Sequence, residues 1–303
     1  MSKQIIFFTL LIFIFNAKIC AQIDSTATEQ SNIQNYTPSK LLEKGKFDIK
    51  WFNNLYTQTR EESNGNTKSI PRANFFTTTL EVFTGVTENK KLNVGLILDY
   101  RSNTFAGNSA LTVFNFDNTV GKARNGLSFI APSVKIAPFN KISNLSIQST
   151  FFIPIAKQEI NANGYLANKS YIWQNRFFYD YTLPNKKFQL FTEFGTRFFF
   201  GKSAKLNGNN NPDGGYANNS LELAPGVFFS YFPSSKFTLL TFAQHAQLID
   251  LGNKFSQNYT ALGLGGKYQL SKTLNIETLY SKFVRGNDSG LGQSFNLGLR
   301  AIF

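Results

Sequence analysis

Apolar and polar residues alternate with a period of two along most of this chain. From about residue 45 to the last residue, segments of roughly ten to fourteen residues show this alternation, which is typical of β-strands. Asn, Gly, Ser, Pro and Lys separate the segments. The pattern predicts about twelve strands, with 10–14 as the range that such boundaries allow. They lie at 46–59, 72–86, 92–103, 126–138, 145–156, 170–183, 188–200, 219–232, 237–248, 258–270, 274–285 and 293–303.

The connections between these segments are alternately short and long. The short ones are 87–91, 139–144, 184–187, 233–236 and 271–273. The mostly longer ones are 60–71, 104–125, 157–169, 201–218, 249–257 and 286–292. Transmembrane β-barrels show this rhythm, with short periplasmic turns and long external loops. An even strand number would place both ends of the barrel domain on the periplasmic side.

Ionisable residues fall on one face of the strands. In segment 188–200, Phe194 and Phe198 share one face, whereas Glu193 and Arg197 share the other. Lys or Arg on a lipid-facing position near the bilayer midplane costs about 2–4 kcal/mol, so immersion in a membrane would require this separation. The sorting predicts a polar lumen lined by Asp48, Lys50, Glu81, Asp99, Arg101, Lys135, Arg176, Asp180, Glu193, Arg197, Glu222, Lys267, Glu277 and Arg300.

A water-soluble β-sandwich would also alternate, with the charges on its solvent face. Its strands usually stop at about five or six residues, however, and these are about twice as long. At least 9–11 residues are needed to cross a bilayer at a barrel tilt, a length that each segment reaches. We therefore predict an all-β chain forming a single antiparallel, up-and-down transmembrane β-barrel over residues 45–303.

The last segment alternates up to the final residue and ends on an aromatic side chain, with Phe295, Leu297, Leu299 and Phe303 on one face. In this it resembles outer-membrane barrel proteins. The resemblance implies that the barrel-assembly machinery reads these four residues as its signal. The abundance of Asn and Lys, with Ala21-Gln22, resembles proteins of Bacteroidetes.

The first 21 residues look like a signal peptide. Lys3 precedes an apolar run from Ile5 to Phe15 that is about half as long as a spanning helix, and cleavage is expected after Ala21. A retained anchor helix is the alternative. Cys20, the single cysteine, follows Ile19, whereas a lipid-modified cysteine normally follows a small residue, so a lipoprotein is the less favoured interpretation. Residues 22–44, rich in Ser, Thr, Gln and Asn, are expected to form a flexible periplasmic arm.

Composition narrows the chemistry. The mature chain would contain no cysteine, which excludes disulfides and thiolate chemistry. Its formal net charge falls from +13 to +11 with the two lysines of the signal peptide, but an exported chain does not meet nucleic acid. Much of this charge lies in the short connections, where phospholipid headgroups or solvent would face it. These lysines are Lys90, Lys91, Lys141, Lys186, Lys187, Lys236 and Lys272.

Candidate catalytic and metal sites are weak. His245 is the single histidine, and outer-membrane phospholipases carry a serine two residues from their histidine, where this chain has Gln247. The Asn- and Gly-rich loop 207–215 has too few carboxylates for tight calcium binding. Gly263, Gly265 and Gly266 are expected to ease curvature or leave lumen space. We expect no catalytic residue, cofactor or metal. Aromatic girdle candidates are Trp51, Tyr100, Trp173, Tyr179, Tyr181 and Tyr231.

The lumen residues comprise seven acids and seven bases, so we expect them to pair instead of forming a strong anion filter. Large residues such as Phe83, Ile97, Phe191 and Phe228 would narrow the bore further. The leading hypothesis is a narrow porin for passive passage of small solutes. A non-conducting adhesion or scaffold barrel is the alternative, and a lipid-active enzyme is third. The expected partners are outer-membrane lipid and the assembly machinery; the solute and the oligomeric state stay open.

Overall fold

The computed structural model describes residues 37–63, 65–156, 166–202, 217–251 and 256–303. The predicted signal peptide 1–21, residues 22–36 of the predicted arm and loop 207–215 lie outside these residues. Among the described residues, no helix is long and apolar enough to span a membrane.

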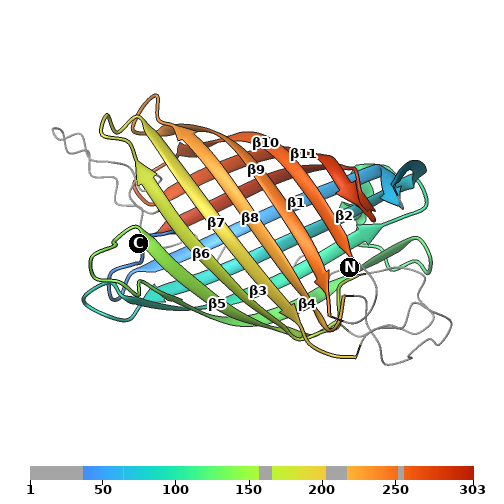
Figure 1. Cartoon of the computed structure of the whole chain (residues 1–303), viewed down its shortest axis with the longest axis horizontal. Coiled ribbons are helices and arrows are strands. Elements are labelled where there is room, and N and C mark those ends of the chain that lie inside the picture. The colour runs from blue at the N-terminus through green and yellow to red at the C-terminus, as the bar shows by residue number, and fades with distance from the viewer. Residues whose placement is uncertain (1–36, 64, 157–165, 203–216, 252–255) are drawn as a thin grey trace, which may run out of the picture.

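Twelve long strands form one antiparallel sheet that closes on itself (Figure 1). Their bounds are β1 (Phe47–Ser63), β2 (Asn66–Gly85), β3 (Leu92–Thr104), β4 (Ala123–Ile136), β5 (Leu145–Pro154), β6 (Ile172–Thr182), β7 (Phe188–Phe199), β8 (Ser220–Tyr231), β9 (Phe237–Asp250), β10 (Gln257–Gln269), β11 (Leu274–Asn287) and β13 (Gln293–Ile302). Each long strand pairs with its sequence neighbours, and β1 pairs with both β2 and β13 to close the ring. A two-residue strand, β12 (Ser289–Gly290), pairs with β1. The predicted closed antiparallel barrel of about twelve strands is confirmed.

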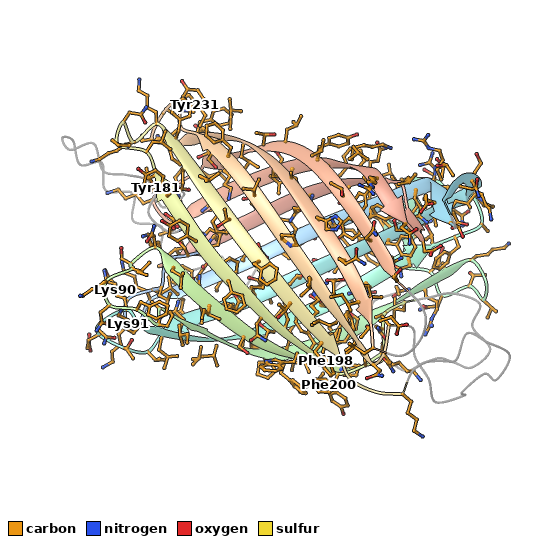
Figure 2. The ribbon with its side chains drawn as sticks, viewed as in Figure 1. Lys90, Lys91, Tyr181, Phe198, Phe200 and Tyr231 are labelled. Carbon is orange, nitrogen blue, oxygen red and sulfur yellow. The ribbon has the colours of Figure 1, made fainter. Side chains whose placement is uncertain are left out.

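Short connections gather at one end of the barrel and longer ones at the other. We call the first the turn end, which carries residues 86–91, 137–144, 183–187, 232–236 and 270–273, and the second the loop end. All seven lysines predicted for short connections lie between strands at the turn end. Lys90 and Lys91 mark it in Figure 2, and Phe198 and Phe200 lie towards the opposite end. Asp48 opposes Ile302, so β1 starts and β13 ends at the turn end.

The structure differs from the predicted elements mainly at the loop end. β1 and β2 continue beyond the predicted bounds to a hairpin in which Ser63 opposes Asn66. The connection 105–122 contains a 3₁₀ helix, η1 (Ala110–Asn115), that folds back onto β2 and β3. Val113 of η1 is fully buried, and its carbonyl accepts a hydrogen bond of 2.6 Å from Ser102 Oγ. This connection is therefore a packed element of the barrel.

Apolar residues face outward along the strands. On β7 and β8 the outward residues Leu190, Phe194, Val227 and Phe229 are each exposed by about two-fifths, as an exterior without aqueous contact requires. Inward positions of the same strands hold Gln189, Glu193, Arg197 and Glu222. Among the described residues, the interior has no single apolar core. Two small clusters, around Leu42 and around Phe129, fill parts of it.

Candidate functional site: the lumen

The candidate site is a cavity of about 690 Å³ that inward side chains of all twelve long strands enclose. Thirteen of the fourteen residues predicted to face the lumen line this cavity. Asp180 does not line it. Its side chain is buried beside the cavity and accepts hydrogen bonds from Thr37 Oγ1 at 3.1 Å and Gln189 Nε2 at 3.4 Å. Because strand residues alternate between the two faces, parity alone could place these side chains.

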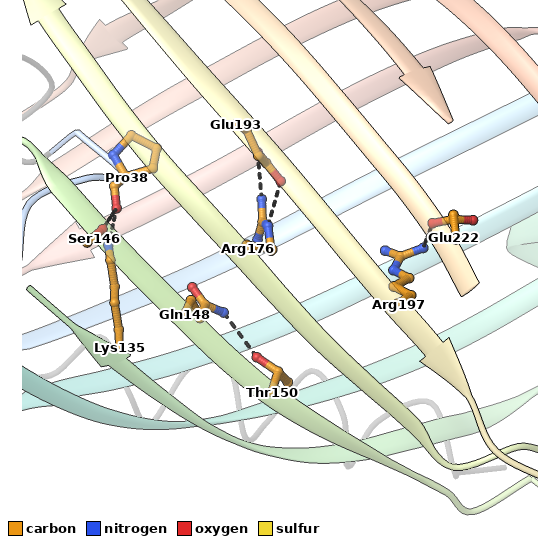
Figure 3. Close-up of polar contacts among 9 residues, drawn as sticks. All are labelled: Pro38, Lys135, Ser146, Gln148, Thr150, Arg176, Glu193, Arg197 and Glu222. Carbon is orange, nitrogen blue, oxygen red and sulfur yellow. Dashed lines mark hydrogen bonds and ion pairs between the residues drawn. The ribbon is translucent and has the colours of Figure 1, made fainter. Parts of the chain in front are cut away.

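Among the described residues, four ion pairs between neighbouring strands link charged side chains of the lumen. Arg176 on β6 meets Glu193 on β7 through two hydrogen bonds of 2.7 and 3.1 Å, and Arg197 Nη1 lies 3.3 Å from Glu222 Oε1 (Figure 3). The others are Lys267–Glu277 at 2.5 Å and Arg300–Asp48 at 2.6 Å. Arg300 and Asp48 join the last long strand to the first. Each pair links two neighbouring strands of the closed ring.

Charges from separate walls also interact across the lumen. Glu81 on β2 interacts electrostatically with Lys135 on β4, Arg176 on β6 and Arg300 on β13. Since these strands are not neighbours of β2, the field of one carboxylate crosses the bore. Fixed charges of both signs therefore face one another across the cavity.

The two Arg–Glu pairs on β7 offer a matched test of pairing strength. We expect Glu193→Gln to lower the free energy of unfolding by about 1–3 kcal/mol, because Arg176 loses a two-point charged partner. Glu222→Gln should cost less, since its single contact with Arg197 is longer and Arg197 is nearly half exposed. Denaturant unfolding of both variants in lipid vesicles checks this. Equal losses would contradict the ranking.

Residues 37–44, which we call the plug segment, enter the barrel at the turn end. Lys135 Nζ donates a hydrogen bond to the carbonyl of Pro38 (Figure 3) and another, of 3.2 Å, to the carbonyl of Lys40. Ser146 Oγ donates to the carbonyl of Pro38 at 3.4 Å. These contacts join the segment to β4 and β5 inside the lumen. This part of the segment predicted to be a flexible arm is therefore packed, because inward polar groups bind its backbone.

The other end of the plug segment is held by apolar packing. Leu42 is almost fully buried against Phe83, Ile97 and Ile302. A Cβ atom added at Gly85 would lie 2.1 Å from the carbonyl oxygen of Glu43, so only glycine allows the segment to pass so close to β2. The apolar pair Leu41-Leu42 in a polar stretch was the sequence signal for this packing, and it was missed.

Ion pairs at the turn end also hold Glu43. Its carboxylate contacts Lys90 Nζ at 2.6 Å and Lys46 Nζ at 3.3 Å. Hydrogen bonds from Lys90 and Lys46 lower the pKa of the Glu43 carboxyl below its ordinary value. The cluster therefore keeps its negative charge in a mildly acidic medium. Because all three side chains are exposed, these pairs add little to stability.

The remaining predicted site residues lie on the wall. His245 lines the cavity, and its Nδ1 lies 3.0 Å from Thr260 Oγ1. A Cβ atom at Gly263 would lie 2.1 Å from the Phe242 ring, and one at Gly265 would lie 2.3 Å from the carbonyl oxygen of Thr278. Neighbouring atoms therefore approach both positions as closely as glycine allows. Among the residues that the structure describes, no group of His, Cys, Asp and Glu side chains could hold a metal ion.

The girdle candidates fall into two groups. Trp173, Tyr179, Tyr181 and Tyr231 are exposed, and Tyr181 and Tyr231 lie at the turn end (Figure 2). Trp51 and Tyr100 are half-buried and hydrogen-bond to neighbouring strands, Trp51 Nε1 to Thr78 Oγ1 at 2.7 Å and Tyr100 Oη to Asn125 Oδ1 at 2.5 Å. Four of the six thus meet the surroundings of the barrel.

The terminal strand presents its apolar residues outward. Phe295, Leu297 and Phe303 are exposed by about half, and Leu299 is partly covered beside Trp51 of β1. Phe303 stacks on Phe47 with ring centroids 6.4 Å apart. That the barrel-assembly machinery recognises these residues stays a prediction.

Comparisons with known proteins agree on the fold. No protein-family model matches the chain, and a search of curated sequences finds no match. A similar solved structure is an outer membrane channel from Pseudomonas putida F1, with a TM-score of 0.70 and 10% identity over 93% of this chain and 100% of that chain. The beta domain of the Bordetella autotransporter BrkA matches with a TM-score of 0.50 and 14% identity over 84% of this chain and 99% of that one. The chain therefore shares the barrel fold of outer-membrane proteins.

Proposed function

We propose that this chain is an outer-membrane channel that lets small solutes pass passively through a narrow lumen. The observation that carries the proposal is the cavity of about 690 Å³ inside a closed barrel whose outer wall is apolar. A closed barrel satisfies all strand hydrogen bonds within itself, which a hydrocarbon environment requires. Export by the predicted signal peptide and residence in the outer membrane of a Gram-negative, Bacteroidetes-like cell are part of the proposal.

The charge of the lining sets the expected selectivity. Eight Lys or Arg and six Asp or Glu side chains line the cavity among the described residues, a formal excess of +2. Strongly selective pores carry rings of one sign. Since four ion pairs neutralise most of this lumen, we expect only a weak preference for anions.

Conductance of the purified protein in planar bilayers tests the proposal. We expect small single-channel currents, a reversal potential under a KCl gradient that indicates slight anion preference, and swelling of liposomes with small neutral solutes. Heat-modifiability on a gel establishes that the inserted barrel is folded. A folded barrel that passes neither ions nor solutes would contradict the proposal.

A non-conducting scaffold is the second candidate, because the plug segment and the charges that cross the lumen both narrow the passage. In that case the external loops would bind a partner. Deletion of residues 207–215, which the sequence predicts as an external loop, distinguishes the two functions, since a channel keeps its conductance and a scaffold loses its partner. The third candidate, a lipid-active enzyme, is tested by a lipase assay of the wild type and of His245→Ala. We expect neither of these two proteins to hydrolyse lipid.

A further inference from the structure

The lumen wall also carries a row of aromatic rings beside the charge network. Phe178, Phe191, Phe228 and Phe242 point inward from the adjacent strands β6 to β9 and all line the cavity. Successive ring centroids are 6.0, 5.4 and 5.3 Å apart. These distances are within the range of aromatic contact, so the four rings form one continuous surface, which we call the phenylalanine strip.

Glycines hold this surface against the wall. The ring of Phe242 lies over Gly263 of β10, where a Cβ would come within 2.1 Å of it. The ring of Phe228 leans towards Gly226 of the same strand, 3.2 Å from where a Cβ would lie. With larger residues at these two positions, the rings would project into the bore. The glycines therefore keep space beside the strip for a solute.

One end of the strip is polar. Arg176 Cζ and Lys135 Nζ lie 4.8 and 5.3 Å from the centroid of the Phe178 ring. Arg176 is already paired with Glu193, and Lys135 already donates to plug carbonyls. An ion in the lumen would have to compete with these contacts. A neutral ring gains stacking along the strip without breaking them.

We infer that the phenylalanine strip binds neutral solutes that present a flat, apolar ring together with hydrogen-bonding groups, and that it guides them through the lumen. The inference rests on the proposed channel function. Strands in such barrels tilt by about 35–45°, so a row that runs across four strands also advances along the barrel axis. Ion pairs and amides such as Gln189 and Gln244, which also line the cavity, would satisfy the polar part of the solute.

Two glucosides that differ only in the group attached to the sugar, phenyl or methyl, test this inference. Phenyl β-glucoside should reduce the ion current at a concentration about 3- to 10-fold lower than methyl β-glucoside, the range that a single aromatic contact supplies. In Phe228→Leu, which interrupts the strip, the potency ratio of the two glucosides should fall towards one. Phe229→Leu is the matched control, because the neighbouring Phe229 faces outward and is 43% exposed. In Phe229→Leu, the potency ratio of the two glucosides should equal that of the wild type.

Equal potency of the two glucosides in the wild type, or an unchanged ratio in Phe228→Leu, overturns the inference while the channel stands. If Phe228→Leu does not fold, Phe191→Leu replaces it. If the wild type passes no current, the channel proposal fails, and saturation-transfer NMR of phenyl β-glucoside with the barrel in detergent tests the strip alone. Weaker transfer in Phe228→Leu than in Phe229→Leu would then support the strip, and equal transfer would reject it.

Discussion

Deletion of residues 37–41 is expected to raise the single-channel conductance several-fold. These residues occupy the turn end of the lumen through the contacts of Lys135 and Ser146 with the Pro38 carbonyl, and Thr37 bonds to Asp180. The deletion keeps Leu42 and Glu43, which hold the chain against β2. Planar-bilayer recordings of the mature protein with and without the five residues measure the effect.

Substitution of the anchor tests the same contact without shortening the chain. Lys135→Met removes the donor to both plug carbonyls and should produce more frequent open events. Lys91→Met is the matched control, because Lys91 Nζ also donates to a backbone carbonyl, that of Phe139 at 3.1 Å, but from an exposed turn. Unchanged currents in both the deletion and Lys135→Met would show that the plug segment does not limit passage.

Phe194→Arg is expected to destabilise the barrel in lipid by about 2–4 kcal/mol, because it places a charge on the outer wall near the middle of β7. Tyr181→Arg, on the outer wall at the turn end, should cost at most about 1 kcal/mol, since an arginine there reaches the headgroups. Denaturant unfolding in vesicles gives both values.

This depth dependence distinguishes a membrane-embedded wall from a wall in water. In an aqueous sandwich, both substitutions would expose a charge to solvent and cost similarly little. Gln244→Arg, which faces the lumen, serves as the inward control and should behave like Tyr181→Arg. Equal effects for Phe194→Arg and Tyr181→Arg would contradict a lipid-facing outer wall.

Strand positions were predictable wherever one face is apolar. Segment 188–200 corresponds to β7 (Phe188–Phe199), and 145–156 corresponds to β5 (Leu145–Pro154). The extension of β1 and β2 was not predictable in this way. Glu61 and Glu62 pair with Lys68 and Thr67, so both faces there are polar and the period of two disappears. Backbone ladder hydrogen bonds form regardless of side-chain polarity, and the hairpin therefore continues.

The lumen was predictable as a set of residues, but its contacts were not. Parity assigned Arg300 and Asp48 to the same interior, yet 252 positions separate them, and only closure of the ring brings them to 2.6 Å. The plug segment has no periodic pattern. Its position depends on Lys135 and Gly85, two residues that belong to different strands.

The sequence by itself predicted about twelve strands, the face that each presents outward and the sorting of charges. It could do so because a shift of one residue would exchange the two faces of a strand. The tertiary structure decided which charges pair, which rings touch along the phenylalanine strip and how the plug segment fills the turn end. These contacts join residues far apart in the chain, and their distances are set by ring closure and strand register, which local alternation does not encode.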